Sequence, residues 1–440
     1  MRLFQLRNIG IIESADIELN GLTLIAGYND IGKSFIGKSI FSVIKTINSS
    51  EREFTESKID EIQRRIDKLY FNLRGISAKI RDELREIKDF FHYKRVFIEQ
   101  LNLNKNDFNF LLEKTKNNLF LLIKESIDNR EESEKIIRNS EEEFIKINNA
   151  FNDLISLEDK EVKFINTHDR IIKTLFQGQI NNKFKENLTS ELNYKEGELK
   201  ILNVEIKNNE TNSFSLKDEF FFQDATFIES PIIMHLSSFI KNQLAFSRSK
   251  KLNENILWID LLEKISQSNN DLSLLSLNEY TKLLEDIKDI INGNVSYNLD
   301  DEDFRFEKSN NHIIKPLNIA SGIKSFGIIQ LLLASNYINE RSLLIIDEPE
   351  VHLHPEWQLK YAELIVKLVK AGITTLITSH SPYMIESILV YSNKYDIFEK
   401  TKLYVGETNE NGSIFLDVTE NPEPIFNKLA HPMQILNFES

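Results

Sequence analysis

The sequence predicts an α/β fold, in which helices cover a mixed sheet and further long helices are inserted between two of its strands. Residues 22–26 and 343–346 are short apolar runs without the alternation of a half-exposed strand. Such runs are typical of strands that are buried on both faces of a sheet. Residues 51–195 contain no Pro and carry apolar side chains at helical spacing. A chain of 440 residues has room for two or three domains.

Composition limits the classes of protein to consider. Hydrophobic residues make up 41% of the chain and include 30 Phe, which is enough for an ordered core. The net charge of -14 argues against general binding to a phosphate backbone and leaves only a local basic patch for DNA. Without Cys there are no disulfides, Cys zinc sites or thiol chemistry. No apolar run is long enough to span a membrane and the N-terminus reads as a strand, so we expect a cytoplasmic protein without a membrane partner.

Residues 50–195 are predicted to be a helical insertion between residues 1–49 and residues 196–440, which together form the α/β part. The apolar side chains near the start of the insertion step by three and four residues, as in a heptad seam. They are Ile59, Ile62, Ile66, Leu69, Leu73, Ile76 and Ile80. Three or four long helices would form either a coiled-coil-like arm or an ordinary helical subdomain, and the spacing leaves both open. The last of these helices is expected to end at Leu192.

Alternating segments on both sides of the insertion predict further strands. They are residues 2–6, 11–19, 199–206, 214–222, 225–228, 295–306, 312–314, 402–405 and 414–418. A helix is predicted over residues 326–337, and residues 232–292 are expected to be mainly helical.

Residues 27–34 (GYNDIGKS) follow one predicted strand and precede a helix, the context that a phosphate-binding P-loop requires. The loop from Gly27 through Asn29 to Gly32 would turn backbone N–H groups around phosphate oxygens. Lys33 would place its charge on the β- and γ-phosphates. The hydroxyl of Ser34 is suited to Mg²⁺. The sequence therefore predicts ATP phosphates and Mg²⁺ at this loop.

A second register of the same pattern, residues 32–39, would assign these roles to Lys38 and Ser39. No strand directly precedes that register, because residues 28–31 resemble a turn. The first register is therefore preferred, and Lys38 is expected to be an ordinary helix lysine.

Three short segments in the last third carry polar side chains suited to a nucleotide. Asp347 and Glu348 end an apolar strand, where open α/β sheets hold their ligands; the alternative is a solvated acidic turn. Ser321 and Gly322 begin a helix and would offer N–H groups to a phosphate, unless Ser321 is simply an N-cap. His380 follows the strand of residues 374–378 and could instead be a core histidine.

A zinc site is a further alternative for the histidines of this region. His352 and His354 have the spacing of a zinc pair. Neither His380 nor any other residue supplies a third ligand at a helpful spacing, and the P-loop already accounts for the region.

The order of these motifs resembles that of ABC-class ATPases of the SMC, Rad50 and RecF type. Residues 347–355 (DEPEVHLHP) are more closely similar to the OLD-like branch, which includes the ATPases of the Septu and PARIS anti-phage systems. The resemblance implies an ABC/RecF-like P-loop ATPase head with a mixed sheet and an inserted long-helix arm or subdomain.

The resemblance also implies roles for single residues in one subunit. Lys33 and the loop around it would hold the phosphates of ATP, and Ser34 and Asp347 would hold Mg²⁺. Glu348 would polarise the attacking water, and His380 would sense the γ-phosphate.

Other roles implied by the resemblance involve a second subunit or are weakly marked. Ser321 and Gly322 would reach the ATP of an opposing subunit, although Ile323 and Lys324 stand where a second Gly is usual. The segment with His352 and His354 would cross the dimer interface. Gln223, before the strand 225–228, is the candidate for a glutamine that contacts the nucleotide.

The function expected from the resemblance is ATP hydrolysis by a homodimer or higher even-numbered oligomer that controls a separate effector, a nuclease or toxin, in anti-phage defence. No nuclease domain is expected in this chain. One alternative is a RecF/Rad50-like DNA-repair or DNA-clamping ATPase, with DNA bound at the best basic patch. That patch is Lys241, Arg248, Lys250 and Lys251, for which the alternative is an ordinary solvated helix face. A second alternative is a slow nucleotide-gated binding module or antitoxin.

Overall fold

The computed structural model describes residues 1–90, 105–155, 160–182, 188–237, 239–240, 255–267 and 278–429. The chain forms two compact units, one of residues 1–48 and 164–440 and one of residues 49–163. The predicted basic patch of Lys241, Arg248, Lys250 and Lys251 lies outside the described residues.

The first unit is built on an eleven-stranded mixed sheet with the strand order β6-β5-β4-β1-β2-β14-β13-β3-β12-β11-β7. Its N-terminal strands are β1 (Arg2–Ile9), β2 (Ile12–Glu18), β3 (Leu22–Ala26), β4 (Ser190–Glu196), β5 (Leu199–Lys207), β6 (Glu210–Leu216) and β7 (Asp224–Ile228). Its C-terminal strands are β11 (Ser342–Asp347), β12 (Thr374–Ser379), β13 (Thr401–Asn409) and β14 (Gly412–Asp417). A separate sheet has the order β10-β9-β8, with β8 (Gly293–Asn298), β9 (Asp303–Lys308) and β10 (Ile313–Ile314).

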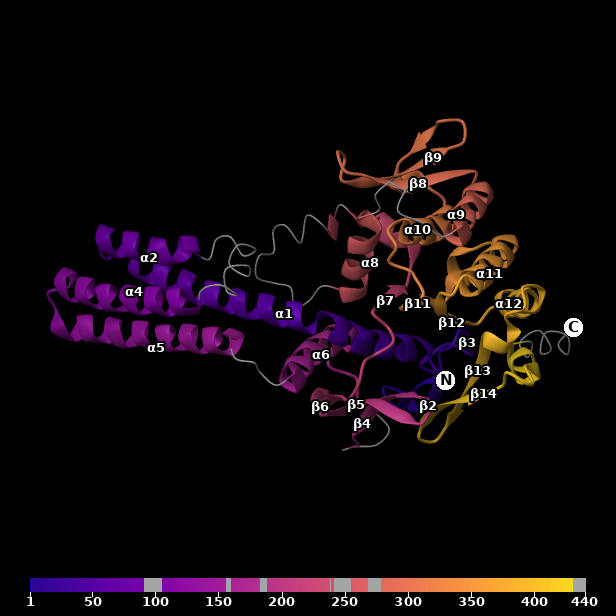
Figure 1. The fold of residues 1–440 in the computed structure, drawn as a ribbon, viewed down its shortest axis with the longest axis horizontal. Helices are drawn as coiled ribbons and strands as arrows, with labels where there is room; N and C mark the ends of the chain where they lie inside the picture. The colour runs from indigo at the N-terminus through magenta and orange to yellow at the C-terminus, as the bar shows by residue number, and fades with distance from the viewer. Residues whose placement is uncertain are drawn as a thin grey trace, which may run out of the picture. The chain divides into compact units, whose positions relative to one another are not determined.

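Helices connect and cover these strands (Figure 1). Among the described residues, the helices of the first unit include the start of α1 (Lys33–Leu73), most of α6 (Lys160–Phe176), α8 (Ile256–Ser266), α9 (Asn278–Ile291), α10 (Ser321–Ala334), α11 (Pro355–Lys370) and α12 (Pro382–Lys394). Short 3₁₀ turns are η1 (Pro231–Met234), η3 (Pro316–Asn318), η4 (Pro349–His352) and η5 (Phe398–Lys400).

Five neighbouring strands, β13, β3, β12, β11 and β7, run parallel, so their carboxyl ends meet at one edge of the sheet. At this edge Ala26 pairs with Ser379, and Asp347 pairs with Thr378. The register therefore brings the residues that follow three distant strands into one place.

The apolar runs of β3 and β11 are buried on both faces, as their lack of alternation predicted. Leu343 and Ile345 pack in the cluster that contains the first turns of α1. Leu344 and Ile346 pack in the opposite cluster, with α10 and α11. Helices on both faces thus fix the sheet edge from which the polar residues project.

The second unit consists of helices and contains the end of α1, α2 (Ala78–Phe90), α4 (Lys105–Ser126) and α5 (Arg130–Ile155). Most of the predicted heptad seam lies in its core, and Ile59, Ile62 and Ile66 are each at most 1% exposed. The seam does not follow a single helix, because α1 ends at Leu73, Ile76 lies in a partly buried turn and Ile80 belongs to α2. Apolar side chains of the other helices, such as Phe144 and Phe151, pack against these residues.

Three predictions about elements need correction. The helical unit ends at Lys163 rather than at residue 195, because α6 packs its apolar face, including Ile172 and Phe176, into the core of the first unit. Leu192 does not end a helix but lies in β4, where it is buried against β1. Residues 220–222 are not a strand: Phe220 and Phe222 fill the core from a loop.

In the described part of the chain, no helix is both long and apolar enough to cross a membrane.

Candidate functional site

The loop of residues 27–34 lies between β3 and α1 at the edge where the parallel strands end. Gly27 has a φ of 152° and Gly32 a φ of 92°, conformations that side-chain-bearing residues rarely adopt. Asn29 is exposed on the outer part of the loop. The backbone thus has the curvature that the glycines of the motif predicted.

Lys33 lies beneath this loop, with only 4% of the residue exposed. Its Nζ donates hydrogen bonds to the carbonyl oxygens of Gly27 (3.0 Å) and Tyr28 (2.7 Å). Oε1 of Glu348 lies 3.4 Å from the same nitrogen. The cation is therefore held at the concave side of the loop and faces the acids that follow β11.

One carboxylate oxygen of Asp347, at the end of β11, contacts residues from two other strand ends. These are Ser34, which follows β3, and Thr378 in β12. Oδ1 of Asp347 accepts hydrogen bonds from Oγ of Ser34 (3.0 Å) and Oγ1 of Thr378 (2.5 Å). Residues 34 and 347 were predicted to share a metal ion, and the structure places their oxygens in contact. Thr378 was not among the predicted residues; its position opposite Asp347 in a parallel register is the signal that could have found it.

Burial raises the pKa of Asp347, against the opposing effect of the hydroxyls of Thr378 and Ser34; the charge of Glu348 raises the pKa further. A bound cation would lower the free-energy cost of burying this charged carboxylate. Carboxylate and hydroxyl oxygens are the donors that Mg²⁺ prefers, so the donor set fits the metal. Asp347 and Ser34 would hold Mg²⁺, which would supply positive charge to phosphate oxygens.

Glu348 is placed by a strained backbone. It lies in the left-handed region with φ 45° and ψ 56°, which is uncommon for a residue with a side chain. Its N–H donates to the carbonyl oxygen of Thr378 (3.2 Å) and to Oγ1 of the same residue (3.1 Å). Strain of this kind gathers at functional sites. In this backbone conformation, the carboxylate of Glu348 points toward Lys33.

His380 follows β12 and lies beside the same carboxylate, with Nδ1 3.6 Å from Oε1 of Glu348. Oε1 of Glu350 is nearer, at 3.3 Å. Glu350 was not among the predicted site residues, although it stands in the same short motif. Its side chain is almost completely buried, whereas an acid after a strand end is usually expected to face water.

Ser321 and Gly322 form the first turn of α10. Ala320 is the N-cap residue and supplies no side-chain hydrogen bond, so the first N–H groups of the helix lack a side-chain cap. Oγ of Ser321 donates to the carbonyl oxygen of His352 (3.2 Å) and the residue is exposed. A Cβ on Gly322 would lie 2.8 Å from the ring of Trp357. Contact with Trp357 explains why a Gly stands here.

Lys324 does not extend this exposed helix start. It is 2% exposed and its Nζ contacts Nε2 of His235. Burial lowers the pKa of Lys324 to about 8. The residue that replaces the usual second Gly of the motif thus points into the protein, on a different side from Ser321.

The two other histidines of the region have separate positions. Nε2 of His352 lies 3.0 Å from Oγ of Ser230, and burial lowers the pKa of His352. His354 is the N-cap of α11, where its Nδ1 accepts the N–H of Glu356 (3.4 Å). Their side chains therefore bind different partners instead of forming a pair.

The structure corrects the placement of Gln223. Its N–H donates to the carbonyl oxygen of Arg341, at the start of β11. Because β7 and β11 run parallel, Gln223 lies at the opposite edge of the sheet from Asp347. The residue at the carboxyl end of β7 is Glu229, which follows Ile228.

Glu229 also bears on the second register of the loop motif. Nζ of Lys38 donates to Oε1 of Glu229 (2.9 Å), and Trp258 donates to the other oxygen (3.0 Å). Lys38 lowers the pKa of Glu229 against the opposing effect of burial. Lys38 thus has an ion-pair partner of its own, while Lys33 and Ser34 contact the acids after β11.

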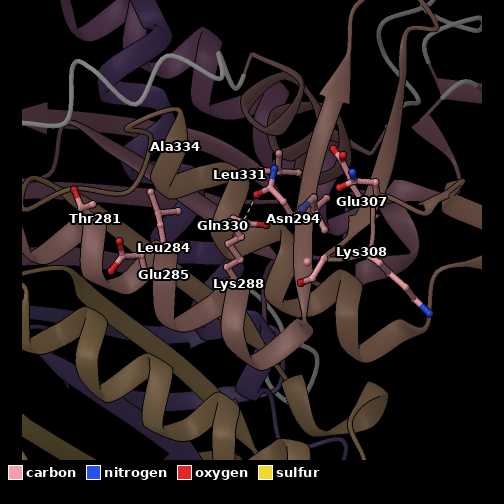
Figure 2. Close-up of a pocket in the computed structure, with 14 residues that line it drawn as sticks. Thr281, Leu284, Glu285, Lys288, Asn294, Glu307, Lys308, Gln330, Leu331 and Ala334 are labelled. Atoms are coloured by element: carbon pink, nitrogen blue, oxygen red, sulfur yellow. Dashed lines mark hydrogen bonds between the residues drawn. The ribbon is translucent and has the colours of Figure 1, made fainter.

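A cavity of about 670 Å³ lies between α9, α10 and the β8–β9 hairpin. Figure 2 shows Gln330 at its centre, with Lys288 and Asn294 beside it. Gln330 accepts the N–H of Val295 (2.9 Å) and donates to Oδ1 of Asn294 (2.7 Å). None of the predicted site residues lines this cavity, so it is distinct from the site at the sheet edge.

Comparison with known proteins gave a limited match to one curated protein. Protein ea59 of Escherichia phage lambda is 28% identical over 136 residues. These residues are 30% of this chain and 24% of the length of ea59.

Solved structures with a similar fold are related only distantly. An SMC head bound to the C-terminal winged-helix domain of ScpA has 11% identity and a TM-score of 0.42, with 96% of this chain and 98% of that chain covered. The SMC head of Thermotoga maritima has 10% identity and a TM-score of 0.39, with coverage of 95% and 99%. Values this low carry no inference about function.

The match to a family model is broader. Residues 1–385 match AAA_15, described as an AAA ATPase domain. This range contains the P-loop, the acids after β11 and His380, which the structure brings to one sheet edge. The chain belongs to the AAA ATPase domain family AAA_15.

Proposed function

We propose that this chain hydrolyses ATP at the carboxyl edge of its parallel strands, as a dimer that encloses the nucleotide and controls a separate effector protein in anti-phage defence. One observation carries the ATPase site: Ser34, Asp347 and Thr378 share a single carboxylate oxygen, while Lys33, Glu348 and His380 converge beside it.

Each group has a task in phosphoryl transfer, which depends on positioning and charge neutralisation. The loop N–H groups and Lys33 bind the β- and γ-phosphates. Ser34 and Asp347 orient Mg²⁺. Glu348 accepts a hydrogen bond from the attacking water and aligns it with the γ-phosphorus, and His380 donates to a γ-phosphate oxygen.

The start of α10 supports the dimer. Ser321 is exposed, lacks a side-chain cap before it and hydrogen-bonds to residue 352 rather than to the P-loop. An uncapped helix N-terminus attracts anions. We infer that Ser321 and Gly322 bind the γ-phosphate held by another copy of the chain, which completes the site.

Exposed apolar side chains in the same region also support an interface. Leu317 in η3 is 78% exposed, Val351 in η4 is 59% exposed and Ile232 in η1 is 46% exposed. The turns η1 and η4 follow the carboxyl ends of β7 and β11, and η3 directly precedes α10. Covering such side chains would stabilise a dimer.

The control of an effector rests on the resemblance of residues 347–355 to the OLD-like branch, with Septu and PARIS as its defence members. Resemblance of this kind is an associational argument. ATP binding would close the dimer and hydrolysis would open it, so that the effector is held in one state and released in the other.

Glu348→Gln tests the enzymatic core of this function. The variant should bind ATP and accumulate as an ATP-bound dimer, measured by mass photometry, while phosphate release falls by at least about 100-fold. A chain that is monomeric with ATP in both forms would contradict the dimer. Unchanged phosphate release would contradict the role of Glu348.

The defence role needs a separate test in cells. Cells that carry this gene with its neighbouring genes should resist phage infection, and Lys33→Ala should remove the resistance. Resistance that is absent, or that survives Lys33→Ala, would contradict it. If DNA instead stimulates the ATPase and the stimulation falls with salt, the RecF/Rad50-like alternative is favoured. ATP binding without turnover would favour the nucleotide-gated binding module.

A further inference from the structure

Glu350 is a buried carboxylate to which the ATPase site as described gives no task. Its side chain is only 3% exposed. Within the described residues, its only ion-pair partner is His380 and no Lys or Arg reaches it. Burying a carboxylate without compensation is costly, so a specific set of donors must hold it.

Those donors all come from the end of β12 and the turn that follows it. Oε1 of Glu350 accepts hydrogen bonds from Oγ of Ser379 (2.8 Å), from the N–H of His380 (2.6 Å) and from the N–H of Ser381 (3.1 Å). One oxygen of a residue after β11 thus fixes the backbone on both sides of His380.

A second contact holds the same turn to the segment after β11. Oγ of Ser381 donates to Oε1 of Gln358 (2.6 Å), and Nε2 of Gln358 donates to the carbonyl oxygen of Leu353 (3.1 Å). The backbone around His380 is therefore anchored at two points. Only the rotation of its ring remains to be set.

Two buried polar atoms without hydrogen-bond partners indicate what sets the rotation of the His380 ring. Nδ1 of His380 and Oε2 of Glu350 are both buried, and neither makes a hydrogen bond with another described residue. Nδ1 lies 3.3 Å from Oε1 of Glu350 and 3.6 Å from Oε1 of Glu348. Buried polar atoms without partners are rare, and a catalytic role is one of the explanations for them.

We propose that Glu350 is the positioning residue of His380: it accepts the Nδ1–H hydrogen bond and so keeps Nε2 directed at the γ-phosphate. The inference rests on the task proposed for His380 in ATP hydrolysis. A carboxylate beside Nδ1 requires a proton on Nδ1, and donation to phosphate requires a proton on Nε2. Glu348 is then left to orient water.

Kinetics test this assignment first. Glu350→Gln should keep the affinity for a fluorescent ATP analogue within about 3-fold and lower kcat by roughly 10- to 100-fold, because an amide is a weaker acceptor for the Nδ1–H group than a carboxylate. Glu350→Asp, which keeps the charge, should retain more activity than Glu350→Gln. Glu410→Gln, at an exposed carboxylate in the β13–β14 turn, is the matched control and should leave kcat unchanged. Wild-type kcat in Glu350→Gln would overturn the assignment.

Nitrogen-15 NMR of histidine side chains provides a test that does not depend on turnover or on a variant of Glu350. In the nucleotide-free wild-type chain, the signal that disappears in His380→Gln should report a proton on Nδ1. An unprotonated Nδ1 would overturn the proposal for Glu350. A protonated Nδ1 in a chain without ATPase activity would instead contradict the proposed function and leave the Glu350 contact standing.

Discussion

Nζ of Lys33 lies 3.4 Å from Oε1 of Glu348, so the cation of the loop of residues 27–34 forms an ion pair with the acid after β11. In the proposed site, the γ-phosphate of ATP would compete with this carboxylate for Lys33. The pair would then link nucleotide affinity to the placement of Glu348, the residue proposed to orient water.

Changing each member of this pair should move ATP affinity in opposite directions. Lys33→Met removes the cation and should weaken binding by at least about 10-fold, since a charge-assisted hydrogen bond is worth roughly 1.5–3 kcal/mol. Glu348→Gln removes the competing charge and should bind ATP as tightly as the wild type or more tightly. Titration with a fluorescent ATP analogue measures both constants. Weaker binding in Glu348→Gln would show that the two residues do not compete.

Asp347→Asn should have opposite effects on the stability of the ligand-free chain and on its stabilisation by Mg²⁺ and ATP. The amide can still accept the hydroxyls of Ser34 and Thr378, and it removes the buried charge whose pKa is raised by burial. We expect a higher Tm without nucleotide and loss of the additional stabilisation by Mg²⁺ and ATP. Thermal unfolding with and without these ligands measures the two effects. A lower Tm in the ligand-free variant would contradict a cost of burying this charge.

Protonation of Asp347 should also shape the pH dependence of metal binding. Because burial raises its pKa in the folded chain, the carboxylate gains a proton at a higher pH than an exposed Asp does. Stabilisation by Mg²⁺ and ATP should therefore weaken as pH falls toward the raised pKa, because the metal needs the charged form. Mg²⁺ titrations followed by Tm at successive pH values test this, with Asp347→Asn expected to show no such trend.

A mixing experiment tests whether Ser321 completes the site of another subunit. Lys33→Ala and Ser321→Arg should each be inactive alone. In a mixed dimer, Lys33 of the second variant and Ser321 of the first form one intact site. Random mixing should therefore restore about a quarter of wild-type ATPase sites, since half of the dimers are mixed and each has one intact site. No recovery after verified subunit exchange would show that Ser321 acts within its own chain.

Parts of the site followed from the sequence because strand polarity and motif spacing constrain them. Parallel strands end at one edge, so the contact between Ser34 and Asp347 could be anticipated from two apolar runs and the residues after them. The position of Glu350 could not be anticipated, because the sequence does not indicate that a third acid after a strand points into the protein. Gln223 was expected to contact the nucleotide, but it precedes β7 and so lies at the opposite edge of the sheet from Asp347. Its closeness to a strand in the sequence was not sufficient to place it at the carboxyl ends.

The helical insertion shows a similar limit. Heptad spacing identified the core of the second unit, since seam residues such as Ile62 are buried. Its end was placed too late because α6 is as amphipathic as the helices before it. The partner of its apolar face, Phe214 beside Phe164 and His168, is distant in the sequence. Periodicity predicts a buried face but not the element that covers it.

His168 should make the folded state sensitive to acid. It is fully buried between Oγ of Ser42 (3.2 Å) and Oγ1 of Thr211 (2.9 Å). Burial lowers the pKa of His168 to about 3. Below the ordinary pKa of about 6.5 the unfolded chain binds a proton that the folded chain does not, so stability falls with pH at up to about 1.4 kcal/mol per pH unit.

Chemical unfolding at pH 7 and pH 5 measures this acid sensitivity of the fold. His168→Gln should flatten the difference between the two pH values, even if it lowers stability at both. His312→Gln, at an exposed histidine, should leave the difference unchanged. Equal pH slopes for wild type and His168→Gln would contradict a neutral buried histidine.

Gly406 in β13 should support the phosphate loop without belonging to any motif. A Cβ at this position would lie 2.4 Å from Cδ1 of Ile31, and the same methyl group approaches within 2.2 Å of a Cβ built on Gly27. The terminal methyl group of Ile31 thus lies between two glycines at which a Cβ would clash with it. Gly406→Val should push Ile31 outward, distort the loop over Lys33 and weaken ATP binding more than it lowers Tm.

Gly75→Ala is the matched control for Gly406→Val, because nothing lies within 4 Å of a Cβ at Gly75. It should leave ATP affinity unchanged. Gly406→Val combined with Ile31→Ala should recover part of the lost affinity, since the smaller side chain removes the clash. A double variant no better than Gly406→Val would show that Gly406 acts through Phe415, the other side chain that a Cβ at this position would meet, at 2.9 Å.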